Sequence, residues 1–175
     1  MKRLVALLFL LLLPACSPAV TPASMVATSV SLVSQTNNMA YCSGVAISPT
    51  RILTAEHCKV GALDGVVWIR FEGDQEVTRT VIESKDLIND LMVLKAEGTN
   101  FRFAKVGDSD TVRRGDSVSF VGAPNGFQEF SFGRGVVAYV GRYIPDEFLQ
   151  RTLPGYFQLF MESRPGRRSC RVGIP

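Results

Sequence analysis

The sequence is poor in the features that build metal sites, nucleic-acid surfaces and helical domains. It contains one histidine and four cysteines, and these do not form a spaced ligand cluster for a metal. We therefore expect no metal and no organic cofactor. The net charge of +3 is too small to indicate a nucleic-acid partner. After the first 13 residues, no long segment repeats apolar residues with the period of a helix, which argues against an α-helical domain.

The N-terminus has the pattern of an export signal. Two basic residues precede an unbroken apolar run at 4–13, which is too short to span a bilayer and matches a signal hydrophobic region. The run ends in LPAC at 13–16, which resembles a bacterial lipobox with a proline as a departure at its second position. We expect 1–15 to be a signal peptide and Cys16 to carry a lipid that anchors the protein to a membrane. Ordinary signal cleavage after Ala15 is the alternative.

The next segment, residues 16–30, is uncharged and rich in Ser, Pro, Ala, Thr and Val. This composition predicts a flexible tether that passes into a first strand near 25–33. Export places the protein in an oxidising compartment, the periplasm or the cell surface, where disulfides form. We therefore expect Cys42 and Cys58 to be paired, which leaves Cys170 without a partner in the sequence.

The rest of the chain reads as short strands. Runs rich in β-branched and aromatic residues recur between turn-forming Gly, Pro, Asp and Asn residues. They predict strands at 41–48, 51–54, 66–71, 77–83, 91–94, 117–121, 129–140 and 156–162. Many short strands at this spacing indicate an all-β sandwich or a pair of barrels.

The single histidine, His57, lies in ILTAEHC at 52–58, where an apolar run ends and small residues turn the chain. A lone histidine is usually structural. Here a disulfide from Cys58 to Cys42 would clamp the loop, and a general base needs a fixed ring because proton transfer depends on hydrogen-bonding geometry. The segment resembles the histidine loop of trypsin-like serine proteases, where Leu-Thr-Ala-Ala-His-Cys presents the catalytic base. Glu56 replaces the second alanine of that pattern.

A second motif offers a partner for the histidine. Asp90 directly precedes an apolar run, LMVLK at 91–95. Most aspartates in such a position merely end a turn, but in the trypsin-like pattern this residue orients the histidine. The resemblance implies that an Asp90 carboxylate oxygen lies within about 3.2 Å of a ring nitrogen of His57. There it would fix the tautomer and stabilise the imidazolium formed during acyl transfer.

A series of glycine motifs makes the resemblance more specific. Each motif alone is ordinary turn sequence, but their joint order is similar to the second barrel of HtrA-type proteases. The motifs are VGDSD at 106–110, RGDSV at 114–118, VGAPNG at 121–126 and FGRGVV at 132–137. The resemblance implies an all-β, chymotrypsin-like domain at 31–166, built of two antiparallel Greek-key β-barrels and acting on a peptide or protein substrate.

The pattern fails where the nucleophile is expected. HtrA-type proteases reach it through Pro-Gly-Asn-Ser-Gly-Gly, and Gly166 matches the glycine of the oxyanion region. Arg168 stands at the nucleophile's position, however, and Ser169 follows one place late. The strands that close the second barrel do not follow, so we expect that barrel to be incomplete at the C-terminus. Residues 167–175 form a basic tail that departs from the family pattern.

Two explanations fit this break. One is a shifted or truncated reading of a longer protease gene, beginning near Arg167. The other is a natural variant in which Ser169 serves or no catalysis remains. The resemblance implies a serine endopeptidase that acts through an acyl-enzyme, with His57, Asp90 and Ser169 as catalytic residues and little activity in this chain. The alternative is a non-catalytic, membrane-tethered pseudoprotease that binds a peptide or partner.

Overall fold

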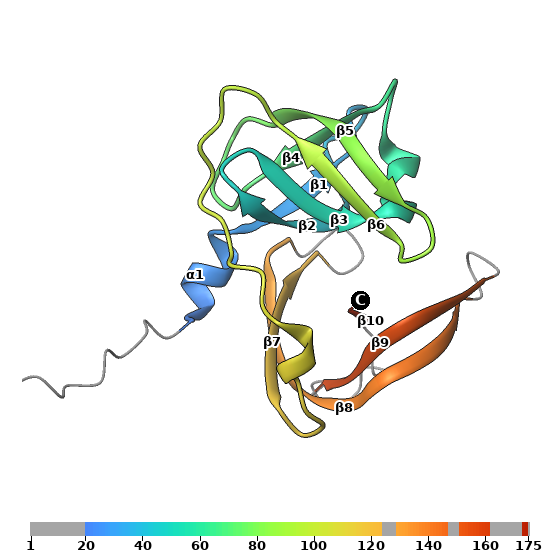
Figure 1. Ribbon diagram of the computed structural model, residues 1–175. Coiled ribbons are helices and arrows are strands. Elements are labelled where there is room, and N and C mark those ends of the chain that lie inside the picture. Colours follow the sequence, from blue (N-terminus) through green and yellow to red (C-terminus); the bar gives the residue numbers. More distant parts are fainter. Residues whose placement is uncertain (1–19, 124–128, 147–150, 162–172, 175) are drawn as a thin grey trace, which may run out of the picture.

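The chain folds into two antiparallel β-sheets preceded by one short helix, as a computed structural model shows (Figure 1). The structure describes residues 20–123, 129–146, 151–161 and 173–174. The predicted signal peptide, the lipidation candidate Cys16, the oxyanion-region Gly166 and the candidate nucleophile Ser169 lie outside these residues. The all-β class predicted from the sequence is confirmed.

The first sheet is a closed barrel of six strands in the order β1-β2-β3-β6-β5-β4. Each of the five runs predicted between residues 41 and 94 is a strand of this barrel. The strands are β1 (Ser29–Val33), β2 (Ala40–Ser48), β3 (Arg51–Ala55), β4 (Val66–Arg70), β5 (Thr78–Asp86) and β6 (Leu91–Lys95). A 3-10 helix, η2 (Glu56–Gly61), follows β3 directly.

Alternating positions of these strands build the core of the barrel. In β4 and β6 the buried residues are Val67, Ile69, Met92 and Leu94, and the residues between them are half-buried. The period of two follows from the pleat of a strand, which turns successive side chains to opposite faces. All five residues of β1 are buried, because this strand also contacts elements outside the barrel.

The segment predicted as a flexible tether, 16–30, requires a correction in its described part. Residues Pro22–Val26 form helix α1, and the first strand begins at Ser29 rather than near residue 25. Thr21 caps the helix: its side-chain oxygen accepts a hydrogen bond from the Ser24 amide, and Ser24 Oγ accepts one from the Thr21 amide. A five-residue helix is too short to produce a detectable apolar period. In the described part of the chain, every helix is too short to cross a membrane.

The second sheet contains four antiparallel strands in the order β10-β9-β8-β7. They are β7 (Ser117–Gly122), β8 (Ser131–Asp146), β9 (Arg151–Met161) and β10 (Gly173–Ile174). A further 3-10 turn, η3 (Ser109–Thr111), precedes β7. Within the described residues this sheet stays open, as expected for an incomplete second barrel. The strand β10 differs from the sequence prediction, which gave residues 167–175 no strand; its backbone pairs with β9.

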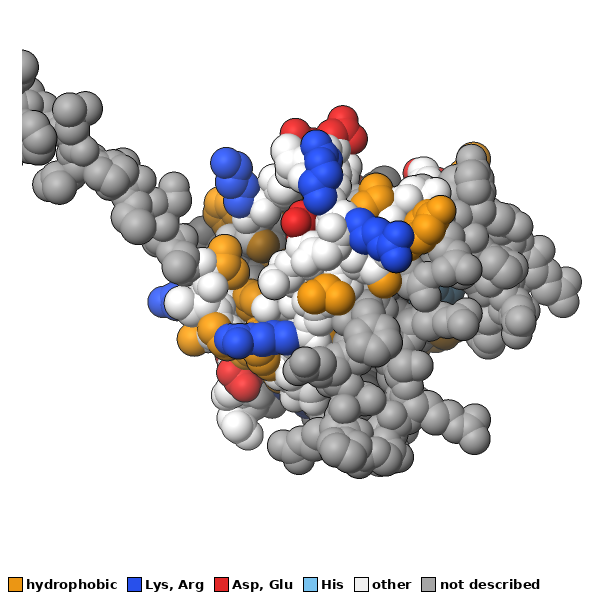
Figure 2. All heavy atoms as spheres, turned by 90° about the horizontal axis from the view of Figure 1, so that it is seen from below, with side chains coloured by type: hydrophobic (Ala, Val, Ile, Leu, Met, Phe, Trp, Pro, Cys, Tyr) orange, Lys and Arg blue, Asp and Glu red, His pale blue; other side chains and the backbone are white. Residues whose placement is uncertain are grey.

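Side-chain interactions join the two sheets. Ser43 Oγ, on β2, accepts a hydrogen bond from the Ala123 amide at 2.9 Å. Arg70, on β4, forms an ion pair with Glu129, and the two side chains are only 17% and 23% exposed. Both interactions fix the ends of the connection between β7 and β8 against the first barrel. Figure 2 views the molecule from below and shows hydrophobic side chains interspersed with Lys and Arg on that face.

Candidate active site

Strand pairing in the first barrel brings His57 and Asp90 together. His57 lies in η2 just after the end of β3, and Asp90 lies in the turn just before β6. These strands are antiparallel neighbours, with Ala55 opposite Leu91, so the two residues meet at one edge of the barrel. Asp90 adopts a left-handed backbone with φ of 56°, a conformation that Asp tolerates better than most residues.

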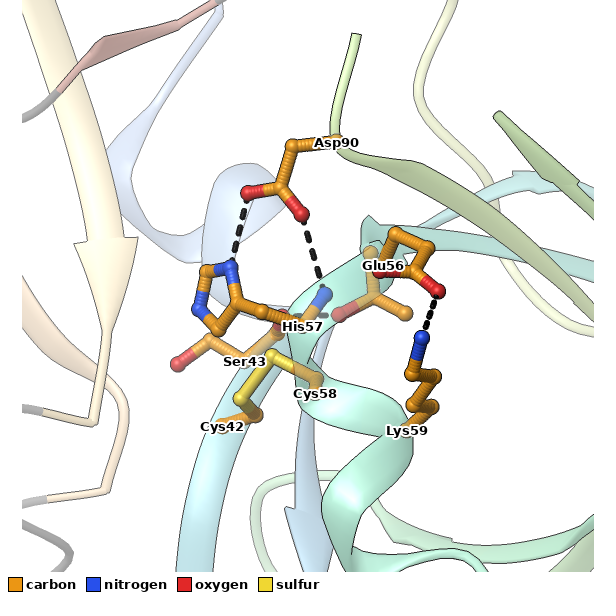
Figure 3. A network of polar contacts seen from close by, with 8 residues as sticks. Cys42, Ser43, Glu56, His57, Cys58, Lys59 and Asp90 are labelled. Carbon is orange, nitrogen blue, oxygen red and sulfur yellow. Dashed lines mark hydrogen bonds and ion pairs between the residues drawn. A yellow bond between two sulfur atoms is a disulfide. The ribbon is translucent and has the colours of Figure 1, made fainter. Parts of the chain in front are cut away.

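Asp90 contacts His57 through both carboxylate oxygens (Figure 3). Asp90 Oδ2 lies 2.7 Å from Nδ1 of the ring, and Asp90 Oδ1 accepts a hydrogen bond from the His57 amide at 2.9 Å. The predicted distance of about 3.2 Å is met. An ionised carboxylate can only accept, so Nδ1 is the donor in this contact, and in a neutral ring the lone pair then lies on Nε2. Asp90 is buried, whereas the His57 side chain is 42% exposed.

A disulfide fastens the histidine segment to the barrel. Cys42 on β2 and Cys58 in η2 are bonded, with their Cα atoms 6.1 Å apart. Cys58 is part of the hydrophobic core, so the bond joins η2 to the barrel interior. Closing a loop of this size stabilises a fold by about 3 kcal/mol in the chain-entropy description.

The C-terminal end of η2, at Gly61, is closely packed against Tyr41. The ring of Tyr41 lies against Gly61, where a Cβ atom would meet the ring at 2.1 Å. Only glycine therefore allows this approach. Burial of the ring raises the pKa of Tyr41. The disulfide at Cys58 and this contact at Gly61 hold the short helix that carries His57 at two points.

Glu56, the departure from the family sequence, now has a structural account. The residue is 3% exposed, and its carboxylate forms an ion pair with Lys59 in the same 3-10 helix (Figure 3). The Glu56 amide also donates to the backbone oxygen of Asp90 at 3.0 Å. The carboxylate therefore turns along η2 and leaves the Asp90–His57 contact undisturbed.

A groove of about 800 Å³ lies between the first barrel, α1 and β7, and His57 and Asp90 form part of its wall. Apolar side chains, among them Leu53 and Phe120, line most of it. The Phe120 ring lies over Gly133 of β8, where a Cβ atom would meet it at 2.1 Å. The site thus combines an oriented imidazole with an adjacent apolar groove that is large enough for side chains of a peptide.

The structure brings together four of the residues predicted from the sequence: Cys42, His57, Cys58 and Asp90. Ser43 was missed, because a serine inside a strand has no motif that reveals a contact 80 positions along the chain. The Arg70–Glu129 pair was missed for the same reason. The two residues lie 59 positions apart and become neighbours only when the sheets pack.

Comparisons with known proteins agree with this architecture. A family model described as the trypsin-like peptidase domain matches residues 42–166. The chain therefore belongs to the trypsin-like peptidase domain family, and its resemblance to HtrA-type serine proteases is confirmed.

Individual relatives point the same way. Over 106 residues the chain is 35% identical to a "Probable periplasmic serine endoprotease DegP-like" of Pseudomonas savastanoi pv. phaseolicola, matching 60% of this chain and 21% of the relative. Over 96 residues it is 34% identical to a protein of the same description from Hahella chejuensis, matching 55% of this chain and 20% of the relative. The chain thus spans about a fifth of the length of these curated relatives.

Two solved structures share the fold. Deg5 superimposes with a TM-score of 0.63 at 22% identity, over 86% of this chain and 74% of that one. The HtrA-type protease AlgW with tripeptide gives a TM-score of 0.66 at 22% identity, over 89% of this chain and 50% of that one. At these identities the likeness shows the chymotrypsin-like fold.

Proposed function

We propose that this chain is a serine endopeptidase domain of the trypsin and HtrA type, in which His57 is the general base and Asp90 orients it. The observation that carries the proposal is the contact of Asp90 with both the ring and the backbone of His57. Nε2 would accept the proton of a serine hydroxyl as its oxygen attacks a peptide carbonyl, and would return that proton to the leaving amine. The Asp90 carboxylate would stabilise the imidazolium between these steps.

Ser169 is the nucleophile candidate, and we expect its turnover to be weak. Arg168 stands at the position where the family has its serine. In an extended segment a shift by one residue turns a side chain to the opposite face, so Ser169 would approach Nε2 poorly. Members of a catalytic triad act as a unit, and a misplaced nucleophile therefore costs most of the rate.

The proposed setting is the periplasmic face of a membrane. The relatives are described as periplasmic, and the sequence predicts a signal peptide at 1–15 with a lipid on Cys16. The substrates we propose are exported peptides or proteins. The apolar lining of the groove favours hydrophobic side chains as the parts that bind beside His57.

A fluorophosphonate reagent tests this function, because it reacts with serines that a base activates. We expect slow labelling of the protein without its signal peptide, lost in Ser169→Ala and in His57→Gln, with little cleavage of casein. Ser163→Ala is the matched control, since Ser163 precedes Gly166 in the sequence. Labelling that persists in Ser169→Ala, or that ignores His57, would contradict the assignment. Robust casein cleavage abolished by Ser169→Ala would show that Ser169 is well placed after all.

A second candidate is a non-catalytic, membrane-tethered module that binds a peptide or protein partner. Two observations favour it: the arginine at the nucleophile's position and the apolar groove beside an exposed imidazole. Complete absence of labelling, with saturable binding of an extended apolar peptide that Phe120→Ala weakens, would support this candidate over the endopeptidase. Phe103→Ala changes another aromatic in the groove wall and tests whether binding follows one subsite or the whole groove.

A further inference from the structure

Cys42, His57 and Cys58 form the one group of three metal-ligating side chains found among the described residues. Their two sulfur atoms and one ring nitrogen all lie within 4.8 Å of one another. Figure 3 shows the imidazole ring beside the disulfide. We propose that reduction of the Cys42–Cys58 disulfide converts this group into a binding site for a thiophilic divalent cation such as Zn²⁺, with His57 as the third ligand. Neither the fold nor the proposed proteolysis requires such a site.

The ring nitrogen lies near the distance from the two sulfurs that zinc ligands need. Zinc bonds of about 2.3 Å to sulfur and about 2.0 Å to nitrogen place tetrahedral ligands about 3.5–3.8 Å apart. The ring nitrogen lies within 4.8 Å of both sulfurs, about 1 Å beyond this spacing at most, and the two sulfurs can separate to it only after their bond is broken. The Cα atoms of the two cysteines, 6.1 Å apart, are held by β2 and η2 in a geometry that suits a shared ion.

Asp90 completes the arrangement around the third ligand. Because its carboxylate occupies Nδ1 at 2.7 Å, ligation falls to Nε2. A histidine that binds zinc through one nitrogen while the other donates to a carboxylate is a common arrangement, since the carboxylate fixes the ring and raises its basicity. The aspartate that would orient a general base would therefore also orient a metal ligand.

Charge and access also suit a cation. Cys58 is 2% exposed, and a lone thiolate there would be costly, whereas two thiolates and a dication are neutral together. His57 is 42% exposed on its side chain and lines the groove, which gives an ion a path from solvent. Three protein ligands leave the fourth tetrahedral position for water on that open side.

The chemistry balances with a dithiol as the reductant. The dithiol supplies two electrons and two protons, so the Cys42–Cys58 bond breaks into two thiols while the reductant forms its own disulfide. The cation then displaces both thiol protons, which pass to solvent, and binds neutral imidazole. Once Nε2 holds the ion, it cannot accept a proton, so the metal-bound and base forms of His57 exclude each other.

Cobalt binding tests the site without reference to peptidase activity. The full chain carrying Cys16→Ser and Cys170→Ser retains only the two thiols of interest; it is reduced with a phosphine, which is removed before Co²⁺ is added. We expect one Co²⁺ per chain with the absorption bands of tetrahedral cobalt thiolate, and none in the oxidised chain. His57→Gln is expected to weaken binding at least ~10-fold and Asp90→Asn about 10–100-fold. Val60→Ala, an exposed change on the same 3-10 helix, is expected to leave affinity unchanged.

Circular dichroism and the fluorescence of Trp68 report whether the reduced chain stays folded. A folded, reduced chain that binds no Co²⁺ would overturn the proposal. The proposal would also fail if the His57→Gln and Asp90→Asn variants bound Co²⁺ as tightly as the parent. If the reduced chain unfolds, Co²⁺ would bind through the thiols alone and its affinity would not depend on Asp90. That outcome would also overturn the proposal. A second measurement is alkylation: Zn²⁺ is expected to protect Cys42 and Cys58 from iodoacetamide in the parent and not in His57→Gln.

Discussion

Asp90 bonds to the ring of His57 through one carboxylate oxygen and to the backbone of His57 through the other. The second bond makes the aspartate a structural element of η2 as well as a partner of the imidazole. The orientation of the ring is therefore coupled to the position of the helix start, and both depend on the turn that precedes β6.

Replacing Asp90 by asparagine tests this coupling through stability. An amide group has one acceptor oxygen, so Asp90→Asn keeps one of the two hydrogen bonds and turns a donor toward an N–H group. We expect the free energy of unfolding in urea to fall by about 1–3 kcal/mol. Asp64→Asn, at an exposed position that also has a positive φ, is the control and is expected to change little. Equal losses of unfolding free energy in the two variants would contradict a structural role for the two hydrogen bonds of Asp90.

The ion pair between the buried Glu56 and the exposed Lys59 predicts an asymmetric response to mutation. Lys59→Met leaves a buried carboxylate without its partner, and we expect a loss of about 1–3 kcal/mol in unfolding free energy. Adding Glu56→Ala removes the stranded carboxylate and is expected to restore stability to within about 1 kcal/mol of the parent. Chemical denaturation of the four proteins of this cycle measures the effect. A double variant as unstable as Lys59→Met alone would show that Glu56 is not the cause.

The Arg70–Glu129 pair is expected to hold the two sheets together. Both side chains are largely buried, so a double-mutant cycle with Arg70→Met and Glu129→Gln is expected to give a coupling energy of about 1–2 kcal/mol. Hydrogen exchange of β7 amides is expected to increase in either single variant, because the β7–β8 connection loses its attachment to β4. Exchange that increases equally throughout the first barrel would indicate global destabilisation instead.

The exposed Arg51–Glu83 pair predicts a local effect of pH. Hydrogen bonds from Arg51, at 2.7 and 2.9 Å, together with its charge, lower the pKa of the Glu83 carboxyl below its ordinary 4.5. Because the folded pKa is the lower one, this pair stabilises the fold above the ordinary pKa, and the contribution is lost as pH falls through the folded pKa. An NMR titration is expected to show the midpoint of Glu83 rising in Arg51→Gln. Arg79→Gln, on β5 like Glu83, is the control. A titration midpoint of Glu83 that moves in Arg79→Gln and not in Arg51→Gln would contradict the assignment.

The sequence predicted those parts of the molecule that depend on local patterns. Alternating apolar residues marked the strands, and the segments around His57 and Asp90 carried a family pattern that placed them at facing strand ends. Helix α1 was not predicted, because a five-residue helix depends mainly on the capping box at its start and has no apolar period. Strand β10 was not predicted, because its two residues are a strand through their pairing with β9 and have no strand pattern of their own.

The contacts of several residues at the site could not be predicted from the sequence. Glu56 could be recognised as unusual from the sequence, but its partner could not, since Lys59 becomes its neighbour only when the segment coils into η2. The contacts of Ser43 and Arg70 with the second sheet depend on how two sheets pack. Packing of this kind is a property of the whole chain and leaves no periodic trace in either segment.

The pairing of β3 with both β2 and β6 sets an order of events during folding. The β2–β3 hairpin turns between Ser48 and Arg51, so it forms from local contacts and brings Cys42 toward Cys58 early. The approach of Asp90 to His57 requires β6 to dock on β3, which closes a much longer loop and is slower. We expect a folding chain to pass through a stage in which the Cys42–Cys58 disulfide is closed and the His57 ring is not yet oriented. Such a chain would lack an oriented imidazole until β6 has docked on β3.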